Sequence, residues 1–296
     1  MRSRLHDQLR FDSAFWRRVL ALGIEHGPTP WLRYSPPLFG LAFAAGLQGP
    51  RDAVRQSLRR VRGELSPWRE AYEVGRVFAN FASSMTDALV ASGRSEFEVR
   101  VDAGAATEAL RSCLDKGRGV ILAVGSTAGW DLAGHVAGAR FDTDVMVVMG
   151  DADLSPAMQM HDEMRERAGV QVMRLGADPV AALPLLSHLR EGKMVATKFD
   201  RHGPTTRCRD VSFFGEPWKV PEGPLRLAAL SGAPVLPFLT RRLGFLHYEF
   251  LHADPIYVPR RPDEQQLDAA AQTLATLLET FVRDNPTQWF RFHEEP

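Results

Sequence analysis

Hydrophobic and polar positions recur with two different periods along the chain. Up to about residue 95, apolar positions follow the 3.6-residue spacing of helices in the blocks 10–25, 51–62 and 66–92. From about residue 98, short apolar runs alternate with helical segments. We therefore predict an N-terminal helical region over 1–95 and an α/β domain over 96–296.

The alternation after residue 98 predicts the order of elements in the second part. Strands that alternate with helices form layered folds in which helices flank a mainly parallel sheet. The expected strands are 119–124, 144–149, 170–173, 194–197, 211–214, 234–239 and 248–251. The expected helices are 128–139, 155–168, 178–191, 222–231 and 263–283. The expected fold class is therefore α/β, with a mainly parallel sheet flanked by helices.

Two segments of the N-terminal helical region have an apolar character that suits a membrane surface. In the helix at 10–25, Phe11 and Phe15 share an apolar face opposite Arg17, which is the pattern of a basic amphipathic helix. The apolar run 37–47 has eleven residues, whereas a bilayer span needs about 20. Each segment either contacts a membrane or packs on its own protein.

The helix at 66–92 has a clear start. Ser66 is a suitable N-cap, Pro67 suits the first helical position, and Glu70 falls in the first turn, where the helix dipole favours an acid.

Composition narrows the class of protein. The chain has 296 residues, of which 45% are hydrophobic and 24% charged, as in ordinary globular proteins. Cys113 and Cys208 lie far apart without a CxxC motif or a histidine at metal spacing, which argues against a zinc site and against a disulfide-built fold. The first thirty residues lack the apolar run and cleavage site of a signal peptide, so we expect a cytoplasmic protein.

Charge is balanced overall but unevenly placed. The formal net charge is zero, which gives no argument for nucleic acid as a partner. Residues 1–63 nevertheless hold eleven arginines and four acidic residues, a net charge of about +7. Arginine can donate two parallel hydrogen bonds to a phosphate, which suits an anionic lipid surface. A genome rich in G and C gives the same preference for arginine over lysine.

The most informative segment for chemistry is 119–134, Gly-Val-Ile-Leu-Ala-Val-Gly-Ser-Thr-Ala-Gly-Trp-Asp-Leu-Ala-Gly. It predicts a buried strand, a turn of small residues, and a helix that opens with Asp131. The segment resembles the strand and His-x-x-x-x-Asp/Glu motif of the lipid A biosynthesis branch of the lysophospholipid acyltransferase superfamily. The Trp-Asp-Leu-Ala-Gly match sets the register, which puts Ser126 at the position of the family's catalytic histidine.

That departure matters because of the reaction that the resemblance implies. An acceptor hydroxyl must lose its proton as it attacks a thioester, and an imidazole held by a carboxylate is a suitable general base. Serine alone cannot do this, and Asp131 is a weak base unless burial raises its pKa.

Three interpretations of the serine at position 126 remain open. In the first, the protein is a catalytically silent homologue that binds acyl chains or supports a biosynthetic complex. In the second, another histidine serves as the base: His135, one helical turn after Asp131, or His202, two residues after Asp200. In the third, the protein transfers acyl groups by positioning alone, or onto an amine that needs less base.

Other segments carry the same resemblance. Residues 164–169 resemble the family's Arg-x-Arg-Phe-Gly segment, which implies that Arg165 meets a phosphate or an oxyanion. Asp200, Arg201 and His202 follow an expected strand, at the sheet edge where α/β proteins bind ligands, and we expect them to bind substrate.

The most specific match is 211–237, which resembles Pro-Phe-Phe-Gly, a spacer, Gly-Pro, Leu-Ala and Gly-Ala-Pro-Val-x-Pro. It predicts a glycine turn at Phe214 and Gly215 and a helix start at Glu222 and Gly223, whose free N–H groups can hold an anion. We expect these four residues to bind substrate. The end of the chain, 285–290, also resembles the family's Pro-x-Gln-Trp ending.

The resemblance implies transfer of a fatty acyl chain from an acyl carrier protein or coenzyme A thioester to a hydroxyl or amine of a lipid-like or small acceptor. That chemistry requires no metal and no bound cofactor. We expect it at the cytoplasmic face of the inner membrane, with the protein bound peripherally, or in the cytoplasm.

Overall fold

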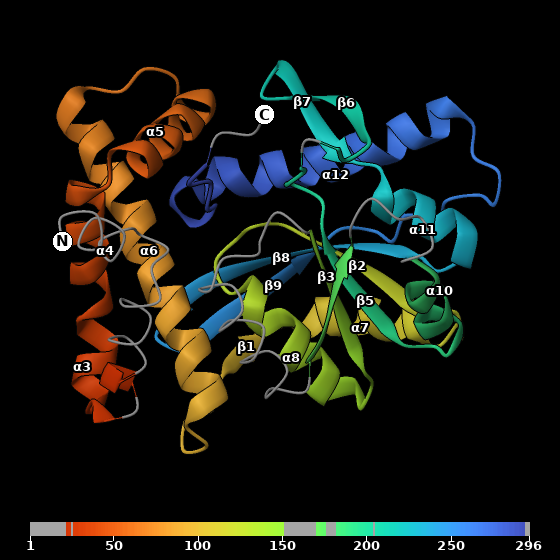
Figure 1. The fold of residues 1–296 in the computed structure, drawn as a ribbon, viewed down its shortest axis with the longest axis horizontal. Coiled ribbons are helices and arrows are strands. Elements are labelled where there is room, and N and C mark those ends of the chain that lie inside the picture. The colour runs from red at the N-terminus through yellow and green to blue at the C-terminus, as the bar shows by residue number, and fades with distance from the viewer. Residues whose placement is uncertain (1–21, 25, 151–169, 176–181, 204, 294–296) are drawn as a thin grey trace, which may run out of the picture.

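The computed structural model describes residues 22–24, 26–150, 170–175, 182–203 and 205–293. Within these residues a seven-stranded sheet forms the centre of the molecule (Figure 1), in the order β1-β9-β8-β2-β5-β3-β4. Its strands are β1 Arg100–Asp102, β2 Val120–Val124, β3 Val145–Gly150, β4 Val170–Leu175, β5 Met194–Lys198, β8 Val235–Gly244 and β9 His247–His252. Neighbouring strands are parallel, except for the antiparallel pair β8 and β9. The predicted mainly parallel α/β sheet is therefore confirmed.

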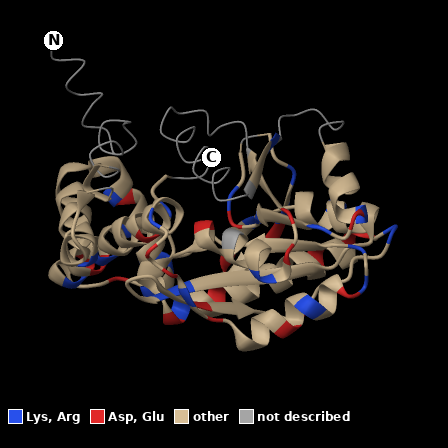
Figure 2. Ribbon diagram, turned by 90° about the horizontal axis from the view of Figure 1, so that it is seen from below, with Lys and Arg blue, Asp and Glu red and all other residues tan. Residues whose placement is uncertain are grey.

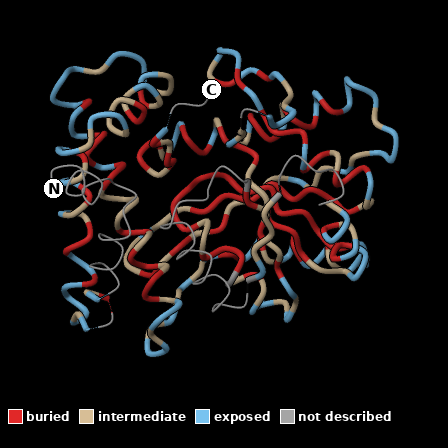
Figure 3. Tube along the Cα trace, viewed as in Figure 1, coloured by how far each residue is buried: buried red, intermediate tan, exposed pale blue. Residues whose placement is uncertain are grey.

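Helices cover both faces of the sheet. The helices that follow the first strand are α7 Gly104–Leu114, α8 Trp130–Phe141, α10 Leu183–Arg190, α11 Gly223–Ser231, α12 Glu264–Asp284 and the short 3-10 helix η3 Pro286–Gln288. Along β2, Ile121 and Ala123 pack in a cluster with α10, α11 and α12, whereas Leu122 packs in a cluster with α7 and α8. Side chains alternate between the two faces of a strand, so the five buried residues of β2 contribute to both layers. Figure 3 shows the buried residues concentrated along these central strands.

A small antiparallel hairpin lies apart from the main sheet. Its strands are β6 Cys208–Phe213 and β7 Glu216–Pro221. The sequence pattern placed 211–214 in the main series of strands and did not predict β7. Phe214 and Gly215 have φ of 52° and 77°, which turn the chain back on itself, and the hairpin packs on α12 instead of joining the sheet.

The N-terminal part is helical, as expected. Its helices are α3 Thr29–Tyr34, α4 Pro36–Gly46, α5 Gln48–Arg62 and α6 Pro67–Gly93. Ser66 is the residue before α6 and Pro67 opens it, as the sequence predicts. The helix expected at 10–25 lies mostly outside the described residues, and the one expected at 155–168 lies wholly outside them. The division of the chain into two domains stays a prediction.

Close packing and buried hydrogen bonds join the N-terminal helices to the sheet. At Gly40 a side chain would come within 2.4 Å of the Phe78 carbonyl oxygen, so glycine lets α4 lie directly on α6. Asp87 of α6 is 1% exposed and accepts hydrogen bonds from Arg242 Nε at 2.7 Å and from the Tyr248 hydroxyl at 2.7 Å. This cluster fixes α6 against β8 and β9.

In the described part of the chain, the helices are too short or too polar to cross a bilayer. Acidic and basic residues are interspersed along the helices and strands (Figure 2).

Candidate functional site

The carboxyl ends of β2 and β5 place Ser126 beside Asp200. These strands are parallel neighbours, and Val124 pairs with Lys198 in their register. Each candidate residue follows its strand by two positions, so the two lie at the same level of the sheet. This is the edge at which α/β proteins bind ligands.

Ser126 and Asp200 form a buried hydrogen-bonded pair. Asp200 is fully buried and Ser126 is 2% exposed. The Ser126 backbone N–H donates to Asp200 Oδ2 at 2.7 Å, and its hydroxyl donates to Asp200 Oδ1 at 3.1 Å. Arg201 Nε donates to the same hydroxyl at 2.8 Å. The single proton of the Ser126 hydroxyl is therefore directed at a carboxylate, while its oxygen accepts from a guanidinium.

The C-terminal segment closes over this pair. Trp289 Nε1 donates to Asp200 Oδ2 at 2.8 Å, and the Phe290 N–H donates to the Ser126 carbonyl at 2.9 Å. Arg201 Nη2 donates to the Phe290 carbonyl at 2.5 Å. Ser126, Asp200, Arg201 and Trp289 thus form one network, which we call the serine cluster.

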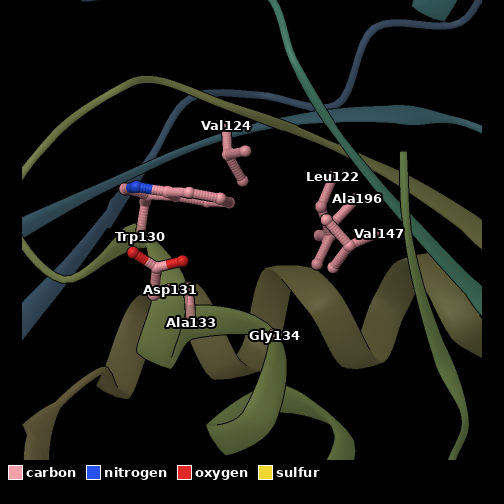
Figure 4. Close-up of a pocket in the computed structure, with 8 residues that line it drawn as sticks. All are labelled: Leu122, Val124, Trp130, Asp131, Ala133, Gly134, Val147 and Ala196. Carbon is pink, nitrogen blue, oxygen red and sulfur yellow. The ribbon is translucent and has the colours of Figure 1, made fainter. Parts of the chain in front are cut away.

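Asp131 lies in the first turn of α8, in the wall of a small pocket (Figure 4). Of the described residues that line this pocket, Asp131 alone is ionisable; the set is Leu122, Val124, Trp130, Asp131, Ala133, Gly134, Val147 and Ala196. The N-terminal end of a helix favours the carboxylate form of an acid in its first turn. We call this the aspartate pocket.

A glycine permits the turn into α8. Gly129 has a φ of 86°, and a side chain there would lie 2.3 Å from the Tyr248 ring. Only glycine satisfies both conditions, and the turn sets Trp130 and Asp131 at the start of the helix.

Lys198 adds a cation next to the aspartate pocket. Its Nζ lies 3.6 Å from the centroid of the Trp130 ring, and Trp130 is one of the lining residues. No motif in the sequence pointed to this lysine.

The structure describes the two histidines expected near Ser126 to different extents. Within the described part of the chain, the Ser126 side chain bonds to Asp200 and Arg201, and His202 is not among its partners. His135 belongs to α8, but its side chain is not described. Arg165 lies outside the described residues. The roles of all three stay predictions.

The other expected site residues lie on the hairpin and at the start of α11. The Phe214 N–H donates to Glu279 Oε2 at 2.8 Å, and Gly215 forms the turn beside it. Glu222 is 4% exposed and accepts from Arg209 Nη2 at 2.7 Å and from Arg226 Nε at 2.5 Å.

Burial would raise the pKa of Glu222, but the hydrogen bonds from Arg209 and Arg226 outweigh it and hold that pKa below its usual value. Gly223 is exposed at the start of α11. Their expected role in substrate binding stays a prediction.

Trp289 is part of the serine cluster although the sequence did not place it in a site. The available signal was the resemblance of 285–290 to the family's ending, which gave no spatial partner. Among the described histidines, cysteines and acids, no group of three is arranged to hold a metal ion.

The fold is α/β, and the strand-turn-helix at 119–134 is the segment that resembles the acyltransferase motif. A sequence model of the bacterial lipid A biosynthesis acyltransferases matches residues 13–295, and the chain belongs to that family.

Two mycobacterial proteins are similar over part of the chain. A phosphatidylinositol mannoside acyltransferase of Mycobacterium tuberculosis is 29% identical over 187 residues, which cover 61% of this chain and 55% of the relative. A phosphatidylinositol mannoside acyltransferase of Mycolicibacterium smegmatis is 31% identical over 132 residues, 43% of this chain and 42% of the relative. The chain thus matches about half the length of these curated relatives.

Proposed function

We propose that this protein transfers a fatty acyl chain from an acyl carrier protein or coenzyme A thioester to a hydroxyl or amine of a lipid-like acceptor. Family membership supports the reaction class. The observation that carries the proposal is Asp131, a carboxylate set among apolar side chains beside the carboxyl end of β2. The names of the mycobacterial relatives suggest a phosphatidylinositol mannoside as one acceptor to test.

In this proposal Ser126 stands at the family's histidine position and Asp131 at the position of the motif's acid. Ser126 does not act as the base, because its proton is already directed at Asp200. Asp131 receives the acceptor's proton. The first turn of α8 favours the carboxylate form of Asp131, which is the form that can accept a proton.

The test is acyl transfer from a long-chain acyl-coenzyme A and from the matching acyl carrier protein thioester, measured as released thiol and as acylated lipid. Asp131→Asn keeps the size of the side chain and removes the base, so we expect activity to fall by about 10²–10⁴-fold. Asp210→Asn is the control, because Asp210 is exposed on β6. His135→Ala tests the one substitute base whose side chain is not described.

A second candidate function is a silent homologue that binds acyl chains or supports a biosynthetic complex. The observation that favours it is the Ser126 hydroxyl, which is 2% exposed and bonded to both Asp200 and Arg201. Here the wild type and Asp131→Asn are equally inert, and Ser126→His regains activity. A wild type that transfers acyl groups and loses this on Asp131→Asn excludes the silent homologue. Ser126 is buried, so a histidine at this position adds volume to the core. Ser126→Ala is the matched variant, because it removes the hydroxyl without adding volume.

We also propose that the protein works at a membrane surface through its N-terminal helices. These helices expose several large apolar side chains, which we call the apolar patch: Trp31, Tyr34, Leu38, Leu41, Trp68 and Tyr72. Arg33 lies over the Tyr34 ring at 5.5 Å and Arg76 over the Tyr72 ring at 5.9 Å. Aromatic rings with arginines beside them suit the interface of an anionic bilayer.

Sedimentation with vesicles tests the membrane proposal. We expect binding to phosphatidylglycerol vesicles, weaker binding to phosphatidylcholine vesicles, and loss of binding in the double variant Trp68→Ser, Tyr72→Ser. Tyr257→Ser is the control, because Tyr257 is 55% exposed but lies outside the apolar patch. Equal binding by the double variant and the control would exclude this surface.

A further inference from the structure

The side chain of Lys198 leaves the sheet on the same face as the aspartate pocket. Along β5, Ala196 packs with the α7 and α8 layer, whereas Val195 packs with the α10, α11 and α12 layer. Because side chains alternate along a strand, Lys198 shares the face of Ala196, which lines the pocket. Two residues of a strand span about 6.6 Å, so Lys198 continues the pocket wall towards the carboxyl end of the sheet.

Trp130 fixes the position of the ammonium group. The ring of Trp130 lines the pocket, and Lys198 Nζ lies 3.6 Å from its centroid. The face of an aromatic ring attracts a cation, so the ring holds the lysine ammonium group at this place. The residue that follows Trp130 is Asp131. The aspartate pocket therefore combines a carboxylate in its wall, a cation at its edge and otherwise apolar surroundings, as Figure 4 shows for Asp131 and Trp130.

We propose that Lys198 is a catalytic residue whose ammonium group donates a hydrogen bond to the carbonyl oxygen of the acyl thioester. This inference rests on the proposed function and adds the group that stabilises the developing negative charge. A fixed cation is most effective where water is excluded and the walls are apolar, because the local dielectric constant is low. The apolar side chains Val124 and Val147 supply such walls.

The step then runs between Asp131 and Lys198. The acceptor oxygen or nitrogen attacks the thioester carbonyl carbon, and its proton passes to the Asp131 carboxylate. The carbonyl electron pair moves onto the oxygen, where the Lys198 ammonium stabilises it. When the carbonyl re-forms, the carbon–sulfur bond breaks, and the departing thiolate takes the proton from Asp131. The products are an ester or amide and a free thiol.

Infrared spectroscopy of a bound carbonyl tests the contact without requiring turnover. The probe is a ketone analogue of a long-chain acyl-coenzyme A, in which a methylene group separates a ¹³C-labelled carbonyl from the sulfur. This probe cannot transfer its acyl group. With the wild type we expect the carbonyl stretch to move to lower frequency on binding, because a hydrogen bond from a cation polarises the carbonyl.

Three variants locate the effect. Lys198→Met keeps a long side chain without charge and should abolish the frequency shift, whereas Lys198→Arg should retain part of it. Lys219→Met is the control, because Lys219 is exposed on β7, and it should leave the shift unchanged. Thermal unfolding of each variant checks that the fold is intact. A wild type that binds no probe or shows no shift, or a shift that persists in Lys198→Met, overturns the proposal.

Turnover separates this inference from the proposed function. With an active wild type, Lys198→Met should lower kcat by about 10²–10³-fold with little change in KM, as for removal of one oxyanion donor. A Lys198-dependent frequency shift in a protein that transfers no acyl chain supports the carbonyl site and refutes the proposed transfer reaction. An active enzyme whose kcat is unchanged in Lys198→Met refutes the role of Lys198 and leaves the transfer reaction standing.

Discussion

Replacement of Asp200 should destabilise the protein by an amount that follows from its hydrogen bonds. Asp200 is fully buried and accepts from the Ser126 N–H, the Ser126 hydroxyl and Trp289 Nε1. In Asp200→Ala the hydroxyl can rotate, but the backbone N–H and the indole N–H lose their acceptor. A buried donor without a partner costs about 1–3 kcal/mol, so the variant should lose about 2–6 kcal/mol.

Asp200→Asn should be milder, and the difference tests the geometry. Both obligatory donors, the Ser126 N–H and Trp289 Nε1, point at the same oxygen, Oδ2. An asparagine that places its one carbonyl oxygen there keeps both hydrogen bonds, while its amide faces the Ser126 hydroxyl, which can accept. We expect a loss of about 1–2 kcal/mol, near the net value of one hydrogen bond.

Urea unfolding followed by far-UV circular dichroism measures these losses, with Asp210→Ala as an exposed control that should stay within about 0.5 kcal/mol of the wild type. The expected order of stability is wild type, Asp200→Asn, Asp200→Ala. A loss below about 1 kcal/mol for Asp200→Ala, or an asparagine variant less stable than the alanine variant, would refute the buried network around Asp200.

Three further predictions concern one turn and two buried polar contacts of the fold. Gly129→Ala should lower the melting temperature more than Gly117→Ala, because both glycines have positive φ but only Gly129 has a ring 2.3 Å from the added carbon; equal losses would contradict this. Tyr248→Phe should lower the free energy of unfolding in urea by about 1.5–3 kcal/mol, because it removes a hydrogen bond to the buried Asp87 carboxylate. An unchanged unfolding midpoint would show that this hydrogen bond contributes nothing to stability. Hydrogen bonding from Arg59 lowers the pKa of the Glu70 carboxyl below 4.5 in the folded state. The carboxylate therefore stabilises the packing of α5 on α6 fully above pH 4.5, and this stabilisation is lost as the pH falls through the lowered folded-state pKa. The free energy of unfolding of Glu70→Gln should therefore fall less than that of the wild type on acidification below pH 4.5, and parallel pH profiles would refute the pairing.

The sequence by itself determined the fold class and most element positions. Period and residue type are local properties, so the apolar run at 119–124 predicted β2, and Ser66 and Pro67 predicted the start of α6. The resemblances at 211–237 and around Asp131 also indicated the family. The helix expected at 263–283 is also confirmed as α12, and the structure adds that the Asp263 side chain caps it.

Only the tertiary structure decided which side chains meet. Ser126 and Asp200 are 74 residues apart in sequence, and Trp289 lies another 89 residues on; they meet because β2 and β5 are neighbours and the C-terminal segment returns across their ends. Period and propensity do not specify strand order, which depends on how whole layers pack.

Tertiary packing also separates the serine cluster from the aspartate pocket. In the sequence, Ser126 and Asp131 form one motif; in the structure, the hydrogen bonds of Ser126 within the described part go to Asp200, Arg201 and Phe290, while Asp131 lines the pocket next to Lys198. A five-residue spacing sets how far apart two residues lie along the chain. The turn at Gly129 and the neighbouring strand decide what each of them faces.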